Sequence, residues 1–171
     1  MAVRDIIILP DKRLRLVSEP VKAIDREVKA LVADLFETMY DAPGIGLAAI
    51  QVGIPRRVVT MDLSKKEEAQ EPRVFINPEI LSREAEITWP EGCLSFPGVT
   101  EEIVRAEKVT VRALDRDGKE FTLSAEGLLA VAIQHEYDHL QGVLMIDHLG
   151  PLKKRLVHRK MQKRSDDRPT P

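Results

Sequence analysis

The sequence contains a single cysteine, Cys93, among its 171 residues. One cysteine excludes a disulfide within the chain, so the fold has to be stabilised by its hydrophobic core. The thiol stays free for chemistry, which makes Cys93 a residue to follow through the rest of the sequence.

Long apolar runs are absent as well. No stretch approaches the ~20 apolar residues that a membrane-spanning helix needs. The first residues, MAVRDIIILPDKRLRL, hold an apolar run of only four residues with acids on both sides. Such a start is typical of neither a signal peptide nor an organelle transit peptide. We therefore expect a cytoplasmic protein that does not bind membranes.

Repeats and low-complexity tracts are missing too, and 43% hydrophobic and 32% charged residues are ordinary for a globular protein. A chain of this length fits one domain with a real core. The net charge of −2 hides an asymmetry, because residues 152–168 carry eight Lys and Arg against two acids, which leaves −8 on the remainder. This basic block is either a solvated helix or frayed tail, or a surface that docks on nucleic acid or a ribosome.

An amphipathic helix is predicted near the N-terminus. In IDREVKALVADLFETMYDAPGIG, apolar residues recur at helical spacing between a candidate Asp25 cap and the helix-breaking Pro43 and Gly44. From Arg57 to Leu123 the pattern changes to short β-rich runs, RVVTMDL, RVFINPEIL and KVTVRALDRDGKEFTL, the last with DRDG as a hairpin turn.

A second helix is predicted from a Ser124 cap to Gly142, a residue type common just past a helix end. Its first half, AEGLLAVAI, is apolar around most of its circumference, which is typical of a buried helix. We expect a C-terminal helix in GPLKKRLVHRKMQKR and a disordered SDDRPTP after it. Together these elements predict an α+β fold with antiparallel β-sheets packed around a central helix and further helices near both termini.

The central helix contains QHEYDHL, in which His135 and His139 are four residues apart and Glu136 follows the first histidine. Residues four apart lie on one face of a helix, so both imidazoles can reach one metal ion. The glutamate lies about 100° further round the helix, where it can take a proton from a water on that ion. This is the division of labour in the H-E-x-x-H pattern.

A simpler interpretation is that these side chains only cover a helix face and pair with neighbours. Against it, HEYDH places several ionisable groups at the end of a buried apolar helix, where desolvation is costly without a cation or strong partners. Asp138 lies between the two histidines and projects elsewhere, so we expect it to orient a neighbour or face water.

A catalytic zinc-type site usually takes three protein ligands and one water, so a third ligand is needed. H-E-x-x-H proteases take their third ligand from further along the chain, either a histidine or a glutamate. Here Met145 occupies the position of that histidine, and no glutamate follows His139. His148 has an unsuitable spacing. Upstream, WPEGCLSFPG places Cys93 in a tight loop between strands, and thiolate is a strong ligand for zinc or iron. Cys93 is the predicted third ligand; the alternative is a small buried hydrophobic residue, the usual fate of a lone cysteine.

Three motifs together make the sequence resemble the peptide deformylases: GIGLAAIQ at residues 44–51, EGCLS at 91–95 and QHEYDHL at 134–140. They follow the family's order and separations, and the resemblance runs to about Leu152. It implies a metal-dependent hydrolase that removes the N-formyl group from the formyl-methionine of newly synthesised polypeptides and releases formate. It also implies a catalytic domain over residues 1–152, with a basic C-terminal helix and disordered tail over 153–171.

The resemblance assigns Cys93, His135 and His139 as metal ligands and Glu136 as the general acid and base. One divalent metal ion is implied, iron(II) in the physiological form, with zinc, nickel or cobalt able to occupy the same ligands. Expected partners are formyl-methionyl nascent peptides, and the ribosome through the basic C-terminal segment. We expect the protein to be a monomer.

The resemblance also implies an oxyanion site, made by the Gln51 amide and the Leu94 backbone N–H, and it counts Gly46, whose backbone borders the substrate, among the catalytic residues. Residues expected to border the substrate are Ile45, Gly46, Trp89, Glu91, Leu128, Val131 and Ala132. The last three lie seven, four and three residues before His135, so helical spacing alone places them on its face. An apolar pocket there suits a methionine side chain.

Two other functions stay open on the sequence. A general metallopeptidase shares the helix but lacks its usual third ligand here, and it would cleave unformylated peptides. A structural zinc module that binds RNA or the ribosome through the basic tail needs a fourth protein ligand to close the site.

Overall fold

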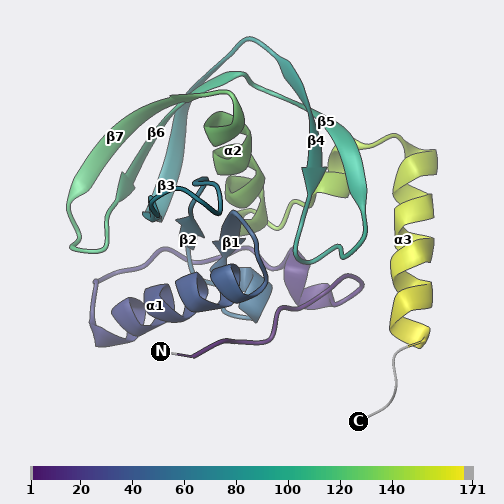
Figure 1. Ribbon diagram of the computed structural model, residues 1–171, viewed down its shortest axis with the longest axis horizontal. Helices are drawn as coiled ribbons and strands as arrows, with labels where there is room; N and C mark the ends of the chain where they lie inside the picture. Colours follow the sequence, from purple (N-terminus) through teal and green to yellow (C-terminus); the bar gives the residue numbers. More distant parts are fainter. Residues whose placement is uncertain (1, 168–171) are drawn as a thin grey trace.

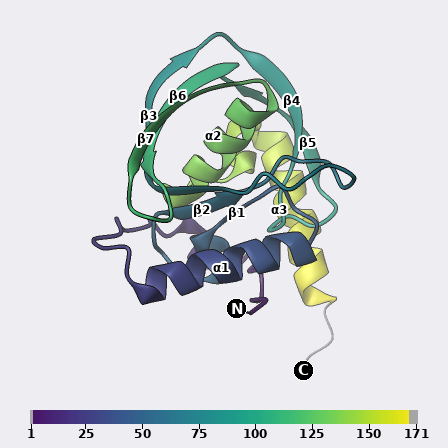
Figure 2. The same ribbon diagram turned by 60° about the vertical axis from the view of Figure 1, so that its left-hand side comes forward.

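The computed structural model describes residues 2–167, in which a curved antiparallel sheet surrounds a central helix (Figure 1, Figure 2). This α+β arrangement confirms the fold class expected from the sequence. The helices are α1 (Arg26–Asp41), α2 (Leu128–Leu140) and α3 (Pro151–Asp166), with short 3-10 helices η1 (Lys12–Arg15), η2 (Ala49–Val52) and η3 (Met145–His148). The strands are β1 (Gly46–Ala48), β2 (Val58–Met61), β3 (Arg73–Glu84), β4 (Ile87–Gly92), β5 (Thr100–Arg105), β6 (Lys108–Leu114) and β7 (Glu120–Glu126).

The strands form two sheets. Five of them pair in the order β1-β2-β3-β6-β7, and β4 pairs with β5 alone, every pairing being antiparallel. Figure 2 shows β3, β6 and β7 curving around α2, while β4 and β5 stand on the other side of that helix in Figure 1. The helix is therefore enclosed by strands from both sheets.

Small side chains allow α2 to lie close to the curved sheet. Ala130, Ala132 and Ile133 belong to the same buried cluster as Val59 and Val111 of the sheet. A helix that presents alanine to a sheet can approach it closely, and burial of the surrounding apolar surface contributes about 25 cal/mol per Å². This packing fixes the direction in which the polar end of α2 points.

The other two helices cover the outside. The predicted Asp25 cap is present, because its carboxylate accepts a hydrogen bond from Val28 N at 2.9 Å, and the apolar face of α1 packs on β1 and β2. Helix α3 buries Val157 and Met161 in a separate cluster with the N-terminal segment and η3. Figure 1 shows α3 standing beside β5.

Three sequence expectations were wrong in detail. The central helix does not start after Ser124, because residues 124–126 continue β7, and α2 begins only after Gly127, whose φ of 64° turns the chain from strand to helix. Strands were expected on either side of the Cys93 loop, but the bounds of β4 and β5 were not predicted. The expected disorder from Ser165 onwards is contradicted at 165–166, which belong to α3, and its residues 168–171 lie outside the described part.

The helices of the described part include none that is both long and apolar enough to cross a lipid bilayer.

Candidate metal centre

The C-terminal half of α2 places three polar side chains in the interior. His135, Glu136 and His139 are 9%, 5% and 1% exposed, respectively. The helix stops directly after them because Gly142, at a φ of 74°, lies against the backbone of η1: a Cβ there would come 2.5 Å from Arg15 O. The packed helix and its glycine end thus bring both imidazoles under the β4–β5 loop.

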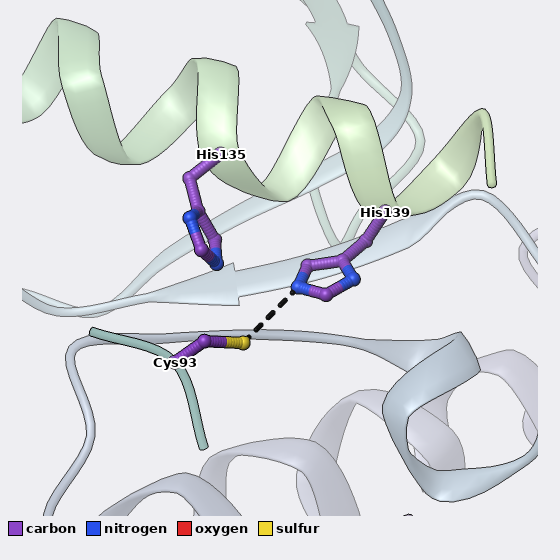
Figure 3. Close-up of side chains that lie close together, drawn as sticks. All are labelled: Cys93, His135 and His139. Carbon is purple, nitrogen blue, oxygen red and sulfur yellow. Dashed lines mark hydrogen bonds between the residues drawn. The ribbon is translucent and has the colours of Figure 1, made fainter. Parts of the chain in front are cut away.

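That loop supplies the sulfur. Cys93 directly follows the end of β4, and a tight turn is closed by the hydrogen bond from Phe96 N to Cys93 O at 2.9 Å. Cys93 Sγ lies 3.4 Å from His139 Nε2, and Figure 3 shows the two rings and the sulfur converging on one point. The ligand atoms of Cys93, His135 and His139 all lie within 4.8 Å of one another.

The predicted third ligand, which precedes His135 by 42 positions in the sequence, is therefore brought to the two histidines. Among residues 2–167, the group of His, Cys, Asp and Glu side chains close enough to share this ion has these three members. A three-ligand group leaves room for a water or a substrate oxygen on a tetrahedral ion. The closed four-ligand site required by the structural zinc module is not found in this group.

Each histidine presents a nitrogen suited to a metal. His135 Nδ1 donates to Glu91 Oε1 at 2.8 Å, so that once the ring gives up its second proton to a metal, Nε2 carries the lone pair that binds the ion. Burial, the positive charge of His135 and that of Arg105 together lower the pKa of His139 well below its usual value, so this ring is neutral. A neutral imidazole is the form that binds a metal.

The charges around His135 favour a cation at the same place. Burial alone would lower the pKa of His135, but the Cys93 sulfur, Glu91 and Glu136 outweigh it and raise this pKa well above the usual value. A group of negative atoms that holds a proton so firmly is suited to hold a metal ion instead. Two buried atoms of α2, His139 Nδ1 and Glu136 Oε1, also have no hydrogen-bond partner within the described chain, which is unusual outside functional sites.

Glu136 has the properties of a proton carrier. Burial, with smaller contributions from Glu91 and Asp138, raises its pKa to about 7 against the opposing charges of His135 and Arg105. The backbone of β1 passes very close, because a Cβ on Gly46 would lie 2.6 Å from Glu136 Oε2. Only glycine fits this position without displacing the carboxylate.

Gln51 lies next to the sulfur at the end of η2. Its Oε1 accepts a hydrogen bond from Ala48 N at 3.0 Å, and its Nε2 donates to Ser95 Oγ at 3.1 Å and lies 3.5 Å from Cys93 Sγ. The amide is therefore held with its N–H groups towards the Cys93 loop.

A cavity of about 620 Å³ opens beside these groups. Every residue predicted for the site borders it except His139. The bordering residues are Ile45, Gly46, Gln51, Trp89, Glu91, Cys93, Leu94, Leu128, Val131, Ala132, His135 and Glu136. The apolar members from α2 occupy one wall, as the helical spacing predicted.

Two functional residues were missed in the sequence. Arg105 is 2% exposed at its side chain and binds Glu91 through Nε at 2.7 Å and through its second terminal nitrogen at 2.9 Å. Against the effect of burial, Arg105 and His135 lower the pKa of Glu91 to about 2, so the carboxylate is charged. Ser95, the partner of Gln51, was also missed. The alternation of β5, which buries Ile103 and Arg105 on one face, was the available signal.

Asp138 lies away from the ligands, as expected, because it binds Arg105 and His148. His148, rejected as a ligand on spacing, is indeed outside the ligand group. A buried H-E-x-x-H helix, a thiol above it and an apolar cavity together place the chain in the class of mononuclear metallohydrolases.

Comparison with known proteins narrows this class. The chain belongs to the polypeptide deformylase family, whose model matches residues 3–155. It is 59% identical over 164 residues to a peptide deformylase of Afipia carboxidovorans, covering 95% of this chain and 96% of that protein. A peptide deformylase of Neisseria gonorrhoeae is 50% identical, with 96% of this chain and 97% of that protein covered.

Solved structures agree with the sequence comparison. A peptide deformylase from Legionella pneumophila superposes with a TM-score of 0.90 at 47% identity, covering 98% of this chain and 100% of that one. A peptide deformylase from Ehrlichia chaffeensis in complex with actinonin gives a TM-score of 0.91 at 39% identity, covering 96% of this chain and 98% of that one. The family resemblance drawn from three short motifs is thereby confirmed over nearly the whole chain.

Proposed function

We propose that this protein is a metal-dependent hydrolase that removes the N-formyl group from the formyl-methionine of newly synthesised polypeptides and releases formate. Membership of the peptide deformylase family supports this reaction. The observation that carries it at the level of residues is the meeting of Cys93, His135 and His139, whose ligand atoms lie within 4.8 Å of one another.

In this proposal Cys93, His135 and His139 hold one divalent ion. When bound, such an ion makes water acidic enough to attack near neutral pH and polarises a carbonyl oxygen. Glu136 accepts the proton of the attacking water and then delivers it to the leaving amine nitrogen. A carboxyl group with a pKa of about 7 suits both steps, because it gains and loses a proton readily at that pH.

Gln51 and Leu94 stabilise the oxygen of the formyl group as it gains negative charge. One N–H of the Gln51 amide donates to Ser95 Oγ and the other points to Cys93 Sγ, so the formyl oxygen would replace the sulfur as the acceptor of that second N–H. Leu94 follows Cys93 in the turn, and we assign its backbone N–H as the second donor. Donors fixed before the reaction need no reorganisation when charge develops.

The substrate peptide lies along β1. This strand is at the edge of the five-stranded sheet, so within residues 2–167 one side of its backbone has no strand partner, and an extended peptide can pair with such an edge. The absence of a side chain at Gly46 lets the formyl group approach Glu136. Leu128, Val131 and Ala132 receive the methionine side chain, and Trp89 and Glu91 form the adjoining wall.

We propose iron(II) as the physiological ion, with zinc, nickel and cobalt as substitutes that fit the same thiolate and imidazole ligands. Elemental analysis of protein purified without oxygen is the test. About one iron per chain is expected. Zinc at the same stoichiometry, with full activity and no iron, would contradict the assignment.

The reaction is tested by formate release from a formyl-methionyl tripeptide, with the acetyl-methionyl and unformylated tripeptides as matched controls. Release of formate from the first peptide alone supports the proposal. Cleavage of peptide bonds in the unformylated control would instead favour the general metallopeptidase. Actinonin, which is present in the Ehrlichia chaffeensis structure, is expected to inhibit the release of formate.

We further propose that residues 1–152 form the catalytic unit of a cytoplasmic monomer, and that 153–171 are a basic appendage that docks on the ribosome. Val157 and Met161 anchor α3, while Arg155 and Arg159 are exposed. The double variant Arg155→Glu/Arg159→Glu should lose co-sedimentation with ribosomes and keep formate release from the tripeptide.

The matched control for docking is a double charge reversal on the N-terminal side, Lys22→Glu/Lys29→Glu, at two exposed lysines. We expect it to co-sediment as the unchanged protein does. Equal loss in both double variants would mean that net charge, rather than α3, governs the association.

A further inference from the structure

A row of polar side chains leads from the candidate metal centre to the surface. His135 Nδ1 binds Glu91 at 2.8 Å, Glu91 binds Arg105 at 2.7 and 2.9 Å, Arg105 binds Asp138 at 2.6 Å, and Asp138 binds His148 at 2.8 Å. The five residues come from β4, β5, α2 and η3. The first four are mostly buried, and the last reaches solvent.

Arg105 is held at both ends of its guanidinium group. Nε and one terminal nitrogen bind the two oxygens of Glu91, and the other terminal nitrogen binds Asp138 Oδ2. The guanidinium is planar and rigid, so a change at the Asp138 end rotates the Glu91 end with it. Because Glu91 orients the ring of His135, the position of Arg105 bears on a proposed metal ligand.

His148 closes the outer end of this row. Its Nε2 lies 2.8 Å from Asp138 Oδ2 and 3.3 Å from the Arg105 nitrogen. A carboxylate only accepts, so at the shorter contact of 2.8 Å the His148 nitrogen donates its hydrogen to Asp138, and its 3.3 Å approach to the Arg105 nitrogen is then not a hydrogen bond. Its side chain is 35% exposed, whereas those of Asp138 and Arg105 are 14% and 2% exposed. The imidazole thus stands between the ion pair and water.

We propose that His148 is a positioning residue for the metal centre, acting through Asp138, Arg105 and Glu91 on the orientation of His135. This inference rests on the metal centre of the proposed function. Without the donated hydrogen bond, water competes for Asp138, the Arg105 end is loosened, and the Glu91–His135 contact becomes less well fixed. The alternative is that the His148–Asp138 hydrogen bond only joins η3 to α2. In that case its loss would lower folding stability and leave the metal centre unchanged.

The test compares His148→Phe, which keeps a ring and removes the N–H, with His148→Gln, whose amide nitrogen can occupy the place of Nε2. Zinc-loaded protein is mixed with excess chelator and the rate of zinc release is followed. Direct partners of metal ligands typically change affinity about 10–100-fold, and His148 acts three contacts further out, so we expect about 3–10-fold faster release for His148→Phe. His148→Gln should release zinc at nearly the original rate.

Two further measurements separate positioning from folding. The visible absorption of cobalt-loaded protein reports the geometry of the ligands, and we expect its bands to shift in His148→Phe only. His158→Phe, the same change at a histidine of α3 outside the row, serves as the matched control and should leave both release and absorption unchanged. If His148→Phe does not fold, His148→Leu replaces it in the same comparison.

The outcomes distinguish this inference from the function on which it rests. Failure of the unchanged protein to bind zinc through Cys93 would overturn the proposed metal centre. Normal zinc binding, with unchanged release and absorption in His148→Phe, would overturn the positioning role alone. Equal acceleration in His148→Phe and His148→Gln would also overturn it, since packing rather than the hydrogen bond would then be responsible.

Discussion

Helices α1 and α2 both bury polar side chains, but they differ in whether those side chains have hydrogen-bond partners. In α1, Asp34 uses both oxygens, one accepting from Ala2 N and one from Arg4 Nε, each at 2.8 Å. In α2, Glu136 Oε1 and His139 Nδ1 are buried without a partner in the described chain. The start of α1 is capped by Asp25, whereas Gly127, the residue before α2, offers no side-chain cap.

The buried polar groups of α1 stabilise the fold, whereas those of α2 take part in the proposed reaction. A fully paired buried carboxylate stabilises the fold, because every lost contact with water is replaced. Unpaired buried atoms are destabilising and are retained where chemistry needs them. The C-terminal half of α2 is held in place by packing and by Glu91 and Arg105, so that its reactive groups can stay incompletely paired.

The largest effect on turnover is expected in α2. Glu136→Ala removes the proton carrier and should lower formate release about 10²- to 10⁴-fold, while the bound metal is kept because Cys93, His135 and His139 are intact. Formate release and metal content are measured on the same preparation. Retained turnover in this variant would remove the assigned role of Glu136.

A smaller loss is expected one contact away from the ligands. Glu91→Gln removes the negative charge beside His135 and turns an amide N–H₂ towards the donors of Arg105. We expect metal affinity to fall about 10–100-fold, as measured by competition with a chelator. Unchanged affinity would mean that Glu91 does not support His135.

The pH dependence of turnover should reveal the raised pKa of the buried Glu136 carboxyl group. Burial raises its pKa, so the carboxylate that accepts a proton from water is lost as the pH falls through that pKa. A bound cation favours the carboxylate, and we therefore expect the acidic limb of kcat/KM between 4.5, the ordinary value, and about 7. A rate constant independent of pH across this interval would contradict the assignment, and the limb should vanish in Glu136→Gln.

The smallest effect on turnover is expected in α1. Asp34→Ala leaves Arg4 and the Ala2 N–H unpaired and should lower the free energy of unfolding by about 1–3 kcal/mol. The kcat of the folded fraction should not change. Denaturant unfolding and formate release, measured on the same variant, check both statements. A fall in kcat at unchanged stability would mean that Asp34 contributes to turnover and not to stability, contrary to the difference drawn between α1 and α2.

Sequence patterns located the parts of the molecule that depend on local spacing. The cap and apolar face of α1, the DRDG turn between β6 and β7, and the paired histidines of α2 are all encoded within a few residues of one another. The cysteine was found by exclusion of other ligands, and the family motifs supplied Gln51 and Leu94.

The contacts that sequence patterns missed are non-local. Strands β4 and β5 contain Pro90, Gly92 and charged residues, which obscure a strand pattern, so Arg105 was not placed on an inward face. Its contact with Glu91 joins two strands, and its contact with Asp138 joins strand and helix. The start of α2 was misplaced because residues 124–126 pair with β6, and this pairing outweighs a local capping signal.

The most direct test of the metal centre is X-ray absorption spectroscopy of the zinc-loaded protein. The spectrum should show one sulfur at about 2.3 Å and two imidazole nitrogens at about 2.0–2.1 Å, with one further light atom completing the shell. Loss of the sulfur signal in Cys93→Ala would confirm its source. A shell without sulfur in the unchanged protein, or one closed by a fourth protein ligand, would contradict an open site built from Cys93, His135 and His139.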